Sequence, residues 1–318
     1  MGYRSKEIKV IKTIRRIRRA NRTIARGYEK YGKEREEMIK KRILLLMLLL
    51  LAIIGCFPIF FLVISSIASG GELRQTLMPM FADGSDSYVW FSLIPSHPTL
   101  QHYVQVLLDS PEFFVTLWNS IRITVVILTL QLVVGVPAAW GFARYDFPFK
   151  KTLFTIYIVL MMMPFQVTML SNYLVLERLQ LLNTHLAISL PAGFSTFPII
   201  IMYRFFKNIP DEVTDAAKID GAGKLRLFSH VALPLGSSGI IAALVLGFLE
   251  SWNLIEQPLT FLADRTLWPL SMYLPTINPV TAGAVFAASV IGMVPAVLVF
   301  LAGQDYLEKG IMAVAIKE

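Results

Sequence analysis

Charged residues are scarce in this sequence of 318 residues. Asp, Glu, Lys and Arg together make up 16% of it, whereas a soluble globular domain contains about 25%. Hydrophobic residues make up 55%, and the mean hydropathy is +0.59. Because the apolar residues come in long uninterrupted blocks, this composition excludes an ordinary soluble enzyme and predicts an all-α integral membrane protein.

Cysteine and histidine are also rare, which excludes several kinds of site. Cys56 is the single cysteine, so neither an intrachain disulfide nor a cysteine-based zinc or iron–sulfur site can form. The four histidines form no HExxH or similar ligand pair. We therefore expect no metal, no cofactor and no catalytic residue on this chain.

The sequence also lacks a nucleotide-binding loop. It contains no GxxxxGK(S/T) pattern, the arrangement that holds nucleotide phosphates. Residues 221–224 are superficially similar to it, but Lys218 replaces the first glycine and Leu225 replaces the hydroxyl residue. Any ATP must therefore be hydrolysed by another chain.

Six apolar stretches are long enough to cross a bilayer. A helix rises 1.5 Å per residue, so about 20 apolar residues cross a hydrocarbon core of roughly 30 Å. Prolines inside the stretches, among them Pro164, predict kinks. The expected fold is therefore six transmembrane helices, at residues 43–67, 114–139, 153–175, 185–206, 236–257 and 282–303.

Positive charge is concentrated in residues 1–42, which hold 16 Lys and Arg but only 5 Asp and Glu. The net charge of +8 belongs to this tail, so nucleic-acid binding does not follow from it. The apolar block after the tail is too long for a cleaved signal peptide, and we expect it to stay as a membrane anchor. The tail itself is expected to be a basic cytoplasmic extension, either solvated or lying on the lipid surface.

The distribution of Lys and Arg also predicts the orientation in the membrane. If the N-terminus is cytoplasmic, the cytoplasmic segments after the tail hold nine Lys and Arg, and the external segments hold three. Cytoplasmic loops of membrane proteins carry such an excess. Both termini are therefore expected in the cytoplasm.

The loop at residues 207–235, between the fourth and fifth spans, has an unusual pattern for a polar connection. Pro210 followed by two acidic residues is typical of a helix start. Small residues such as Ala216 would let another surface approach the backbone closely. Gly221 breaks this helix, and a second apolar stretch leads into the next span at Pro234. We expect two short helices that project from the membrane and dock on a soluble partner.

Polar side chains inside the spans are candidates for a transport pathway. Arg122 and Glu250 lie nine and eight residues from the expected external ends of their spans, a depth of about 12 Å. One hypothesis is that they pair or face one hydrated cavity; the alternative is two separately solvated groups. Amides such as Gln131 suit sugar hydroxyls, but they also bond neighbouring helices. The candidate translocation path comprises Arg122, Glu250, Asn253, Gln166 and Asn172.

Several motifs resemble those of permease subunits in binding-protein-dependent ABC importers. Asp215-Ala216-Ala217, three residues, Gly221, nine residues and Val231-Ala232-Leu233-Pro234 are similar to the EAA loop of that family, with Asp for the usual Glu and Val for Ile. Further matches, to the maltose-type carbohydrate permeases, are Asn119-Ser120, Ala143-Arg144-Tyr145, Met163-Pro164, Trp252-Asn253 with Pro258, and Gln304-Asp305-Tyr306 with Gly310.

The resemblance implies a type I ABC importer permease fold with a cytoplasmic coupling helix. It divides the chain into the extension 1–42, a first transmembrane helix and external loop at 43–113, a permease core at 114–306 and a tail at 307–318. The core includes the EAA loop at 210–234. The tail departs from the family's usual glycine-rich ending, which puts contacts made by that tail in relatives in doubt here.

The resemblance also implies a function and partners. The chain would work with a second permease subunit, two ATPase subunits that bind ATP and Mg, and an external solute-binding protein, in the plasma membrane of a bacterium. An oligosaccharide or other carbohydrate is the expected solute. The alternatives are peptides, amino acids or polyamines, or, from a different class, an ion-coupled secondary transporter. The residues that would dock on the ATPase are Asp215, Ala216, Ala217, Gly221, Leu233 and Pro234.

Overall fold

The computed structural model describes residues 37–81, 94–273 and 280–315, and all regular structure in these ranges is helical. Five helices are long and apolar enough to cross a membrane, and a bent pair of helices is a sixth candidate span. The predicted all-α membrane fold is therefore confirmed. The chain divides into two units, Met1–Phe61 and Leu62–Glu318. Most of the basic extension lies outside the described residues.

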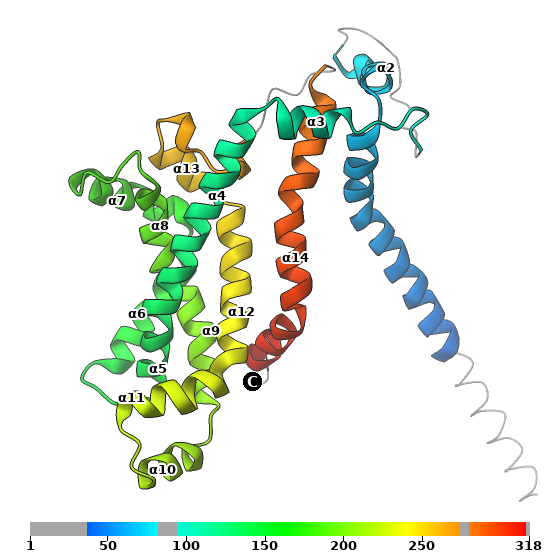
Figure 1. The fold of residues 1–318 in the computed structure, drawn as a ribbon. Helices are drawn as coiled ribbons and strands as arrows, with labels where there is room; N and C mark the ends of the chain where they lie inside the picture. Colours follow the sequence, from blue (N-terminus) through cyan, green and yellow to red (C-terminus); the bar gives the residue numbers. More distant parts are fainter. Residues whose placement is uncertain (1–36, 82–93, 274–279, 316–318) are drawn as a thin grey trace, which may run out of the picture. The chain divides into compact units, whose positions relative to one another are not determined.

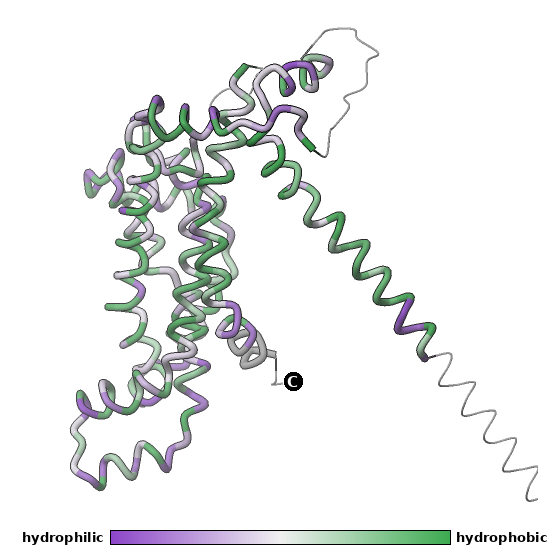
Figure 2. Tube along the Cα trace, turned by 45° about the vertical axis from the view of Figure 1, so that its right-hand side comes forward, coloured by the Kyte–Doolittle hydropathy of each residue, from purple (hydrophilic) through white to green (hydrophobic). Residues whose placement is uncertain are grey.

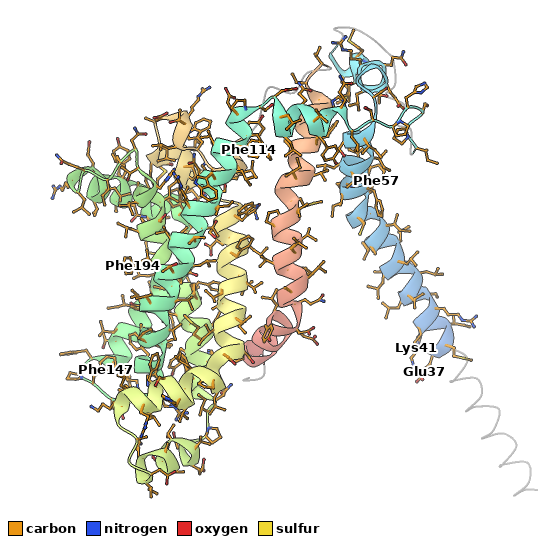
Figure 3. The ribbon with its side chains drawn as sticks, in the orientation of Figure 1. Glu37, Lys41, Phe57, Phe114, Phe147 and Phe194 are labelled. Carbon is orange, nitrogen blue, oxygen red and sulfur yellow. The ribbon has the colours of Figure 1, made fainter. Side chains whose placement is uncertain are left out.

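The described part of the first unit is a single apolar helix. It belongs to the helix Glu37–Ile67, whose mean hydropathy reaches 3.0 over 18 residues. Glu37 and Lys41 lie in its first turns and Phe57 lies farther along (Figure 3). After those first turns the helix is hydrophobic along its length (Figure 2). A helix that is apolar on all sides suits a bilayer, as predicted for residues 43–67.

The second unit contains four other membrane-length segments. In it, α12 packs against α14, α9 and α4, while α5 packs against α9 and α4 against α8 (Figure 1). These segments match the predicted spans 114–139, 185–206, 236–257 and 282–303, except that the helix in the third of these ends at Trp252. The segments are α4–η1–α5 (Pro111–Leu130, Gln131–Gly135 and Val136–Arg144), α8–α9 (His185–Gly193 and Thr196–Lys207), α12 (Leu233–Trp252) and α14 (Ala282–Ala315).

Glycines allow α12 and α9 to pack closely. A Cβ atom on Gly236 would come within 2.2 Å of Cε1 of Phe206, and one on Gly239 within 2.3 Å of Cγ of Phe205. Small residues at such positions let helix backbones approach each other, which is how helices associate in a bilayer. The aromatic rings of α9 thus occupy the space that side chains on α12 would fill.

The predicted third span, residues 153–175, is not one straight helix. α6 (Lys150–Met162) and α7 (Phe165–Arg178) meet at 107°. The break lies at Met163 and Pro164, whose ψ angles are 122° and 151°. A proline disfavours the helical conformation of the residue before it and has no N–H for the helical hydrogen bond. The sequence predicted a kink here, but the turn is sharp enough to separate two helices.

Short helices lie at the two ends of the second unit. We call one the α10 end, because α10 (Asp211–Ile219) lies there with α11 (Lys224–Leu227) and the π-helix η2 (Phe228–Ala232) (Figure 1). The opposite end is the α13 end. It carries α2 (Gly70–Phe81), α3 (Gln101–Leu108), α13 (Glu256–Phe261) and the 3₁₀ helices η3 (Arg265–Leu267) and η4 (Leu270–Met272).

Candidate functional site

The first candidate site is the loop that carries α10. Pro210 precedes this helix with a φ of −59° and a ψ of 142°, and Asp211 and Glu212 occupy its first turn, where the helix dipole favours acidic side chains. Thr214 is buried, and its hydroxyl donates a hydrogen bond of 2.8 Å to the carbonyl of Asp211. The helix therefore begins where the sequence predicted.

The end of α10 depends on a glycine. The N–H of Gly221 donates to the carbonyl of Lys218 (3.0 Å), and the N–H of Ala222 donates to that of Ala217 (2.9 Å). Gly221 has a φ of 80°, a left-handed conformation that costs other residues roughly 1–2 kcal/mol. A Cβ atom there would meet nothing within 4 Å, so the backbone conformation and not space requires glycine.

The loop exposes apolar side chains. Ile219 is 85% exposed and Leu225 is 79% exposed, and Ala216 is exposed as well, while Ala217 packs against the core. Asp215, also predicted to dock, forms a surface ion pair of 2.8 Å with Lys218. Exposed apolar residues surrounded by charged ones are typical of an interaction surface.

Leu233 and Pro234, the other residues predicted to dock, lie in the first turn of α12. Leu233 is half-buried against the core, whereas Pro234 is exposed. Proline is favoured in a first helical turn because the missing N–H needs no partner there. These two residues therefore belong to the membrane-length segment that follows α10. They are separated from α10 itself by α11 and η2.

The second candidate site is a cavity of about 660 Å³ within the second unit. Its walls come from α4 and η1, the bend between α6 and α7, the junction of α8 and α9, and the end of α12. Small-molecule sites typically have volumes of about 300–1,000 Å³. The polar residues of the lining are Gln131, Thr168, Asn172, Ser195, Thr196, Glu250, Ser251 and Gln257.

The lining combines hydrogen-bonding groups with aromatic rings. Amides and hydroxyls can both donate and accept hydrogen bonds, and the Glu250 carboxylate accepts them when it is ionised. Phe165, Phe194 and Phe197 add apolar surface, and Phe194 lies at the end of α8, midway along the bundle (Figure 3). Such a cavity suits a solute with many hydroxyl groups and apolar ring faces.

Gln131 occupies an unusual position in this lining. It begins the π-helix η1, a local distortion of the kind often found at functional sites. The side chain is 4% exposed, and its Nε2 donates a 3.4 Å hydrogen bond to the carbonyl of Ala192. Its Oε1 has no hydrogen-bond partner among the described residues. A buried amide oxygen without a partner is costly, and this atom lies in the wall of the cavity, where a small movement of the Gln131 side chain would expose it.

The structure brings together only part of the predicted translocation path. Asn172 and Glu250 line the cavity. Gln166 instead donates a 2.6 Å hydrogen bond to a carboxylate oxygen of Glu256. Asn253 donates to the carbonyl of Leu249 in its own helix (2.8 Å) and lines a separate cavity of about 290 Å³.

The hypothesis that Arg122 pairs with Glu250 is not supported by the structure. The Arg122 guanidinium lies 5.6 Å from the centre of the Trp118 ring, a distance typical of a cation–π contact. In the described part of the chain, no ion pair joins Arg122 to Glu250. Equal depth in two spans was not sufficient to predict a contact.

Several residues of the cavity lining were not singled out from the sequence. Thr168, Ser195, Thr196 and Gln257 line the cavity, but Ser and Thr in a span usually bond to their own helix. Thr168, Ser195 and Thr196 depend for their position on the α6–α7 bend and the α8–α9 junction, and Gln257 lies in α13. Pro164 at the first break, and Pro191 and Pro198 on either side of the second, are the signal that could have pointed to them.

Comparisons with known proteins give a consistent result. The family described as binding-protein-dependent transport system inner membrane component matches residues 131–313, which is more than half of the chain. An arabinooligosaccharide transport system permease of Halalkalibacterium halodurans is 27% identical over 288 residues, covering 90% of this chain and 99% of that protein. A diacetylchitobiose uptake system permease of Streptomyces coelicolor is 28% identical over 258 residues, covering 78% of this chain and 80% of that protein.

A solved structure shares the fold. It is a bacterial ABC transporter involved in the import of the acidic polysaccharide alginate; the matching chain has a TM-score of 0.72 and 23% identity. The match covers 86% of this chain and 98% of that one. The helical architecture, the loop between the α9 and α12 segments and the extent of these matches lead to one conclusion: the chain belongs to the binding-protein-dependent transport system inner membrane component family.

Proposed function

We propose that this chain is the permease subunit of an ATP-driven importer that moves a neutral oligosaccharide across the plasma membrane. The observation that carries the choice of solute is the lining of the 660 Å³ cavity, which offers amides, hydroxyls, three Phe rings and one carboxylate. Among the described residues of that lining there is no Lys, Arg or His. An anionic solute would be expected to face a basic group, so a neutral, hydroxyl-rich solute is favoured.

The names of the relatives support the same solute class. The Halalkalibacterium halodurans protein is named for arabinooligosaccharides, and the Streptomyces coelicolor protein for diacetylchitobiose. Both solutes are chains of sugar rings. Peptides, amino acids and polyamines are the competing solutes, and polyamines would use Glu250 as a counter-charge.

The orientation follows from charge. Residues 1–42 carry 16 Lys and Arg, and positively charged segments stay in the cytoplasm. The N-terminus and the α13 end are then separated by an odd number of membrane crossings, so the α13 end faces outward. The α10 end faces the cytoplasm, and so does the C-terminus. The external solute-binding protein approaches the α13 end.

The α10 loop docks on a separate ATPase. Ala216, Ile219 and Leu225 supply exposed apolar contact surface, and Gly221 sets the angle between α10 and the segment after it. Two such ATPases hold ATP and Mg, and a second permease completes the pathway. Closure of the ATPases around ATP moves the docked loops and changes which side of the membrane the cavity opens to.

The experiment is uptake into proteoliposomes that contain this chain, its partner permease and the ATPases. Labelled oligosaccharide is expected to accumulate only under two conditions. ATP must be present on the side of the membrane that carries the ATPases, and the solute-binding protein must be present on the other side. Unlabelled neutral glycans compete, whereas peptides and polyamines do not. Competition by a polyamine alone would reject the carbohydrate assignment, and accumulation without ATPases would reject the importer assignment.

A further inference from the structure

The beginning of the α10 loop is held by a side chain from a different span. The guanidinium of Arg144, the last residue of α5, contacts the carboxylate of Asp211 and the backbone carbonyl of Ile209. The Arg144 side chain is 11% exposed, whereas that of Asp211 is 83% exposed. A charge-assisted contact whose cationic partner is largely buried holds its geometry better than a surface ion pair.

The end of the same loop is also held by α5. Trp140 of α5 packs edge-on against Phe206, which precedes the loop, with ring centroids 5.5 Å apart and planes at 75°. It also contacts Phe228, which follows α10, with ring centroids 6.4 Å apart. The Arg144 guanidinium lies 5.7 Å from the Trp140 ring. These contacts fix both sides of the loop to the terminus of α5, in addition to its chain connections to α9 and α12.

The opposite end of the same continuous helix holds a second loop. Nδ2 of Asn119 in α4 donates to the carbonyls of Thr266 (2.7 Å) and Trp268 (3.0 Å). The hydroxyl of Ser120 accepts a 2.7 Å hydrogen bond from the N–H of Leu270. Asn119 and Ser120 are 5% and 2% exposed, so these bonds are shielded from water and strengthened by their low-dielectric surroundings.

Hydrogen bonds connect residues of the 264–270 loop to one another and to a neighbouring segment. Oδ1 of Asp264 accepts hydrogen bonds from the N–H (2.9 Å) and the hydroxyl (2.8 Å) of Thr266, and these bonds lower the pKa of Asp264 below its ordinary value. Oδ1 of Asn183 accepts from the N–H of Asp264 (2.8 Å). The 264–270 loop is thus tied to α4 and to the segment before α8.

From these contacts we infer that the helix α4–η1–α5 is the mechanical link between the α10 loop and the 264–270 loop, with Arg144 and Asn119 as the positioning residues at its two ends. Asn119 and Arg144 are 25 positions apart, which corresponds to about 37 Å of helix, and the helix is unbroken from the α13 end to the α10 end (Figure 1). A displacement of the α10 loop therefore moves the 264–270 loop through the helix α4–η1–α5. A displacement of the 264–270 loop likewise moves the α10 loop. This inference rests on the proposed function, in which the two loops contact the ATPase and face the external binding protein.

The test measures how far solute-loaded binding protein stimulates ATP hydrolysis by the complete reconstituted complex. Arg144→Met keeps the aliphatic stem that packs on Trp140 but removes the contacts to the α10 loop. Asn119→Leu removes the two donors at similar volume. Each variant is expected to assemble and to keep its basal rate of hydrolysis, while stimulation falls about fivefold or more, the lower end of typical coupling effects.

Matched variants separate transmission from general damage. Lys150→Gln removes an ion pair to Asp146 (3.1 Å) near the same end of the unit that does not involve the α10 loop, and it should keep full stimulation. If Arg144→Met fails to assemble, the milder variant Asp211→Asn tests the contact at the α10 end. If Asn119→Leu fails to assemble, Ser120→Ala tests the contact with the 264–270 loop. Both substitutions interrupt the same mechanical link, so the variant that carries both should lose no more stimulation than each single variant. Two independent defects would instead give losses that add.

The outcomes are distinguishable. Full stimulation in the variants at either end, or additive losses in the double variant, would overturn the mechanical link. A wild-type complex that is not stimulated by loaded binding protein would instead count against the proposed function.

Discussion

Gly247 lies directly against the amide of Gln131: a Cβ atom on Gly247 would come within 2.4 Å of the Gln131 Oε1. Both residues line the 660 Å³ cavity. The glycine therefore leaves room for a buried amide whose oxygen has no partner among the described residues. This contact between α12 and the π-helix η1 sets the position of a buried hydrogen-bond acceptor in the cavity wall.

Gly247→Ala is expected to displace Gln131 and reduce solute uptake. Adding a methyl group to a tightly packed site costs about 1–3 kcal/mol, and here the group that must move is part of the cavity lining. Uptake by reconstituted vesicles measures the effect. The matched control is Gly141→Ala in α5, where a Cβ atom would meet nothing within 4 Å. Equal uptake by the two variants would show that the position of Gln131 has no role in transport.

Glu250→Gln is expected to weaken solute recognition more than it changes the maximal rate. A hydrogen bond to a charged acceptor contributes about 1.5–3 kcal/mol, so the solute concentration needed for half-maximal uptake should rise by roughly tenfold. Asn253→Ala is the control, because the Asn253 amide bonds to its own helix and lies outside the cavity lining. A larger change in the Asn253 variant than in the Glu250 variant would place the solute in the smaller cavity instead.

Gly221→Asp is expected to uncouple ATP hydrolysis from uptake. The φ of 80° at Gly221 costs a residue with a Cβ atom roughly 1–2 kcal/mol, so the substitution changes the angle at which α10 is presented. Gly223→Asp is the control, because Gly223 has a φ of −68° and a Cβ atom there would also meet nothing within 4 Å. The measurement is the amount of ATP hydrolysed per solute molecule imported. If this ratio stays at its wild-type value in the Gly221→Asp variant, the backbone conformation at residue 221 is unimportant for coupling.

Much of the fold could be predicted because membrane helices follow from length and hydropathy. Four predicted spans in the second unit correspond to helical segments, and the helix–glycine–helix pattern of the α10 loop is present. The 107° bend between α6 and α7 was predicted only as a kink, because the effect of Pro164 depends on the helices packed around it. Composition and spacing carry no information about that packing.

The candidate site was harder to predict than the fold. Asn172 and Glu250 line one cavity, but Gln166 and Asn253 satisfy their amides within the protein. Whether a polar side chain in a span faces a solute or a neighbour depends on helix rotation and on loop structure. The contact of Arg144 with the α10 loop joins residues 67 positions apart, which a single sequence cannot reveal. The roles of the docking and path residues stay predictions.

The central claim is that the α10 loop docks on an ATPase subunit. A photo-crosslinking amino acid placed at Ile219, which is 85% exposed, tests it in cells that express the whole transporter. The same group at Leu108, which is 77% exposed at the α13 end, is the matched control.

We predict that illumination joins residue 219, and not residue 108, to a subunit that carries a GxxxxGK(S/T) nucleotide-binding loop, identified by mass spectrometry of the adduct. An adduct between residue 219 and an external solute-binding protein, or an ATPase adduct formed only from residue 108, would contradict the account.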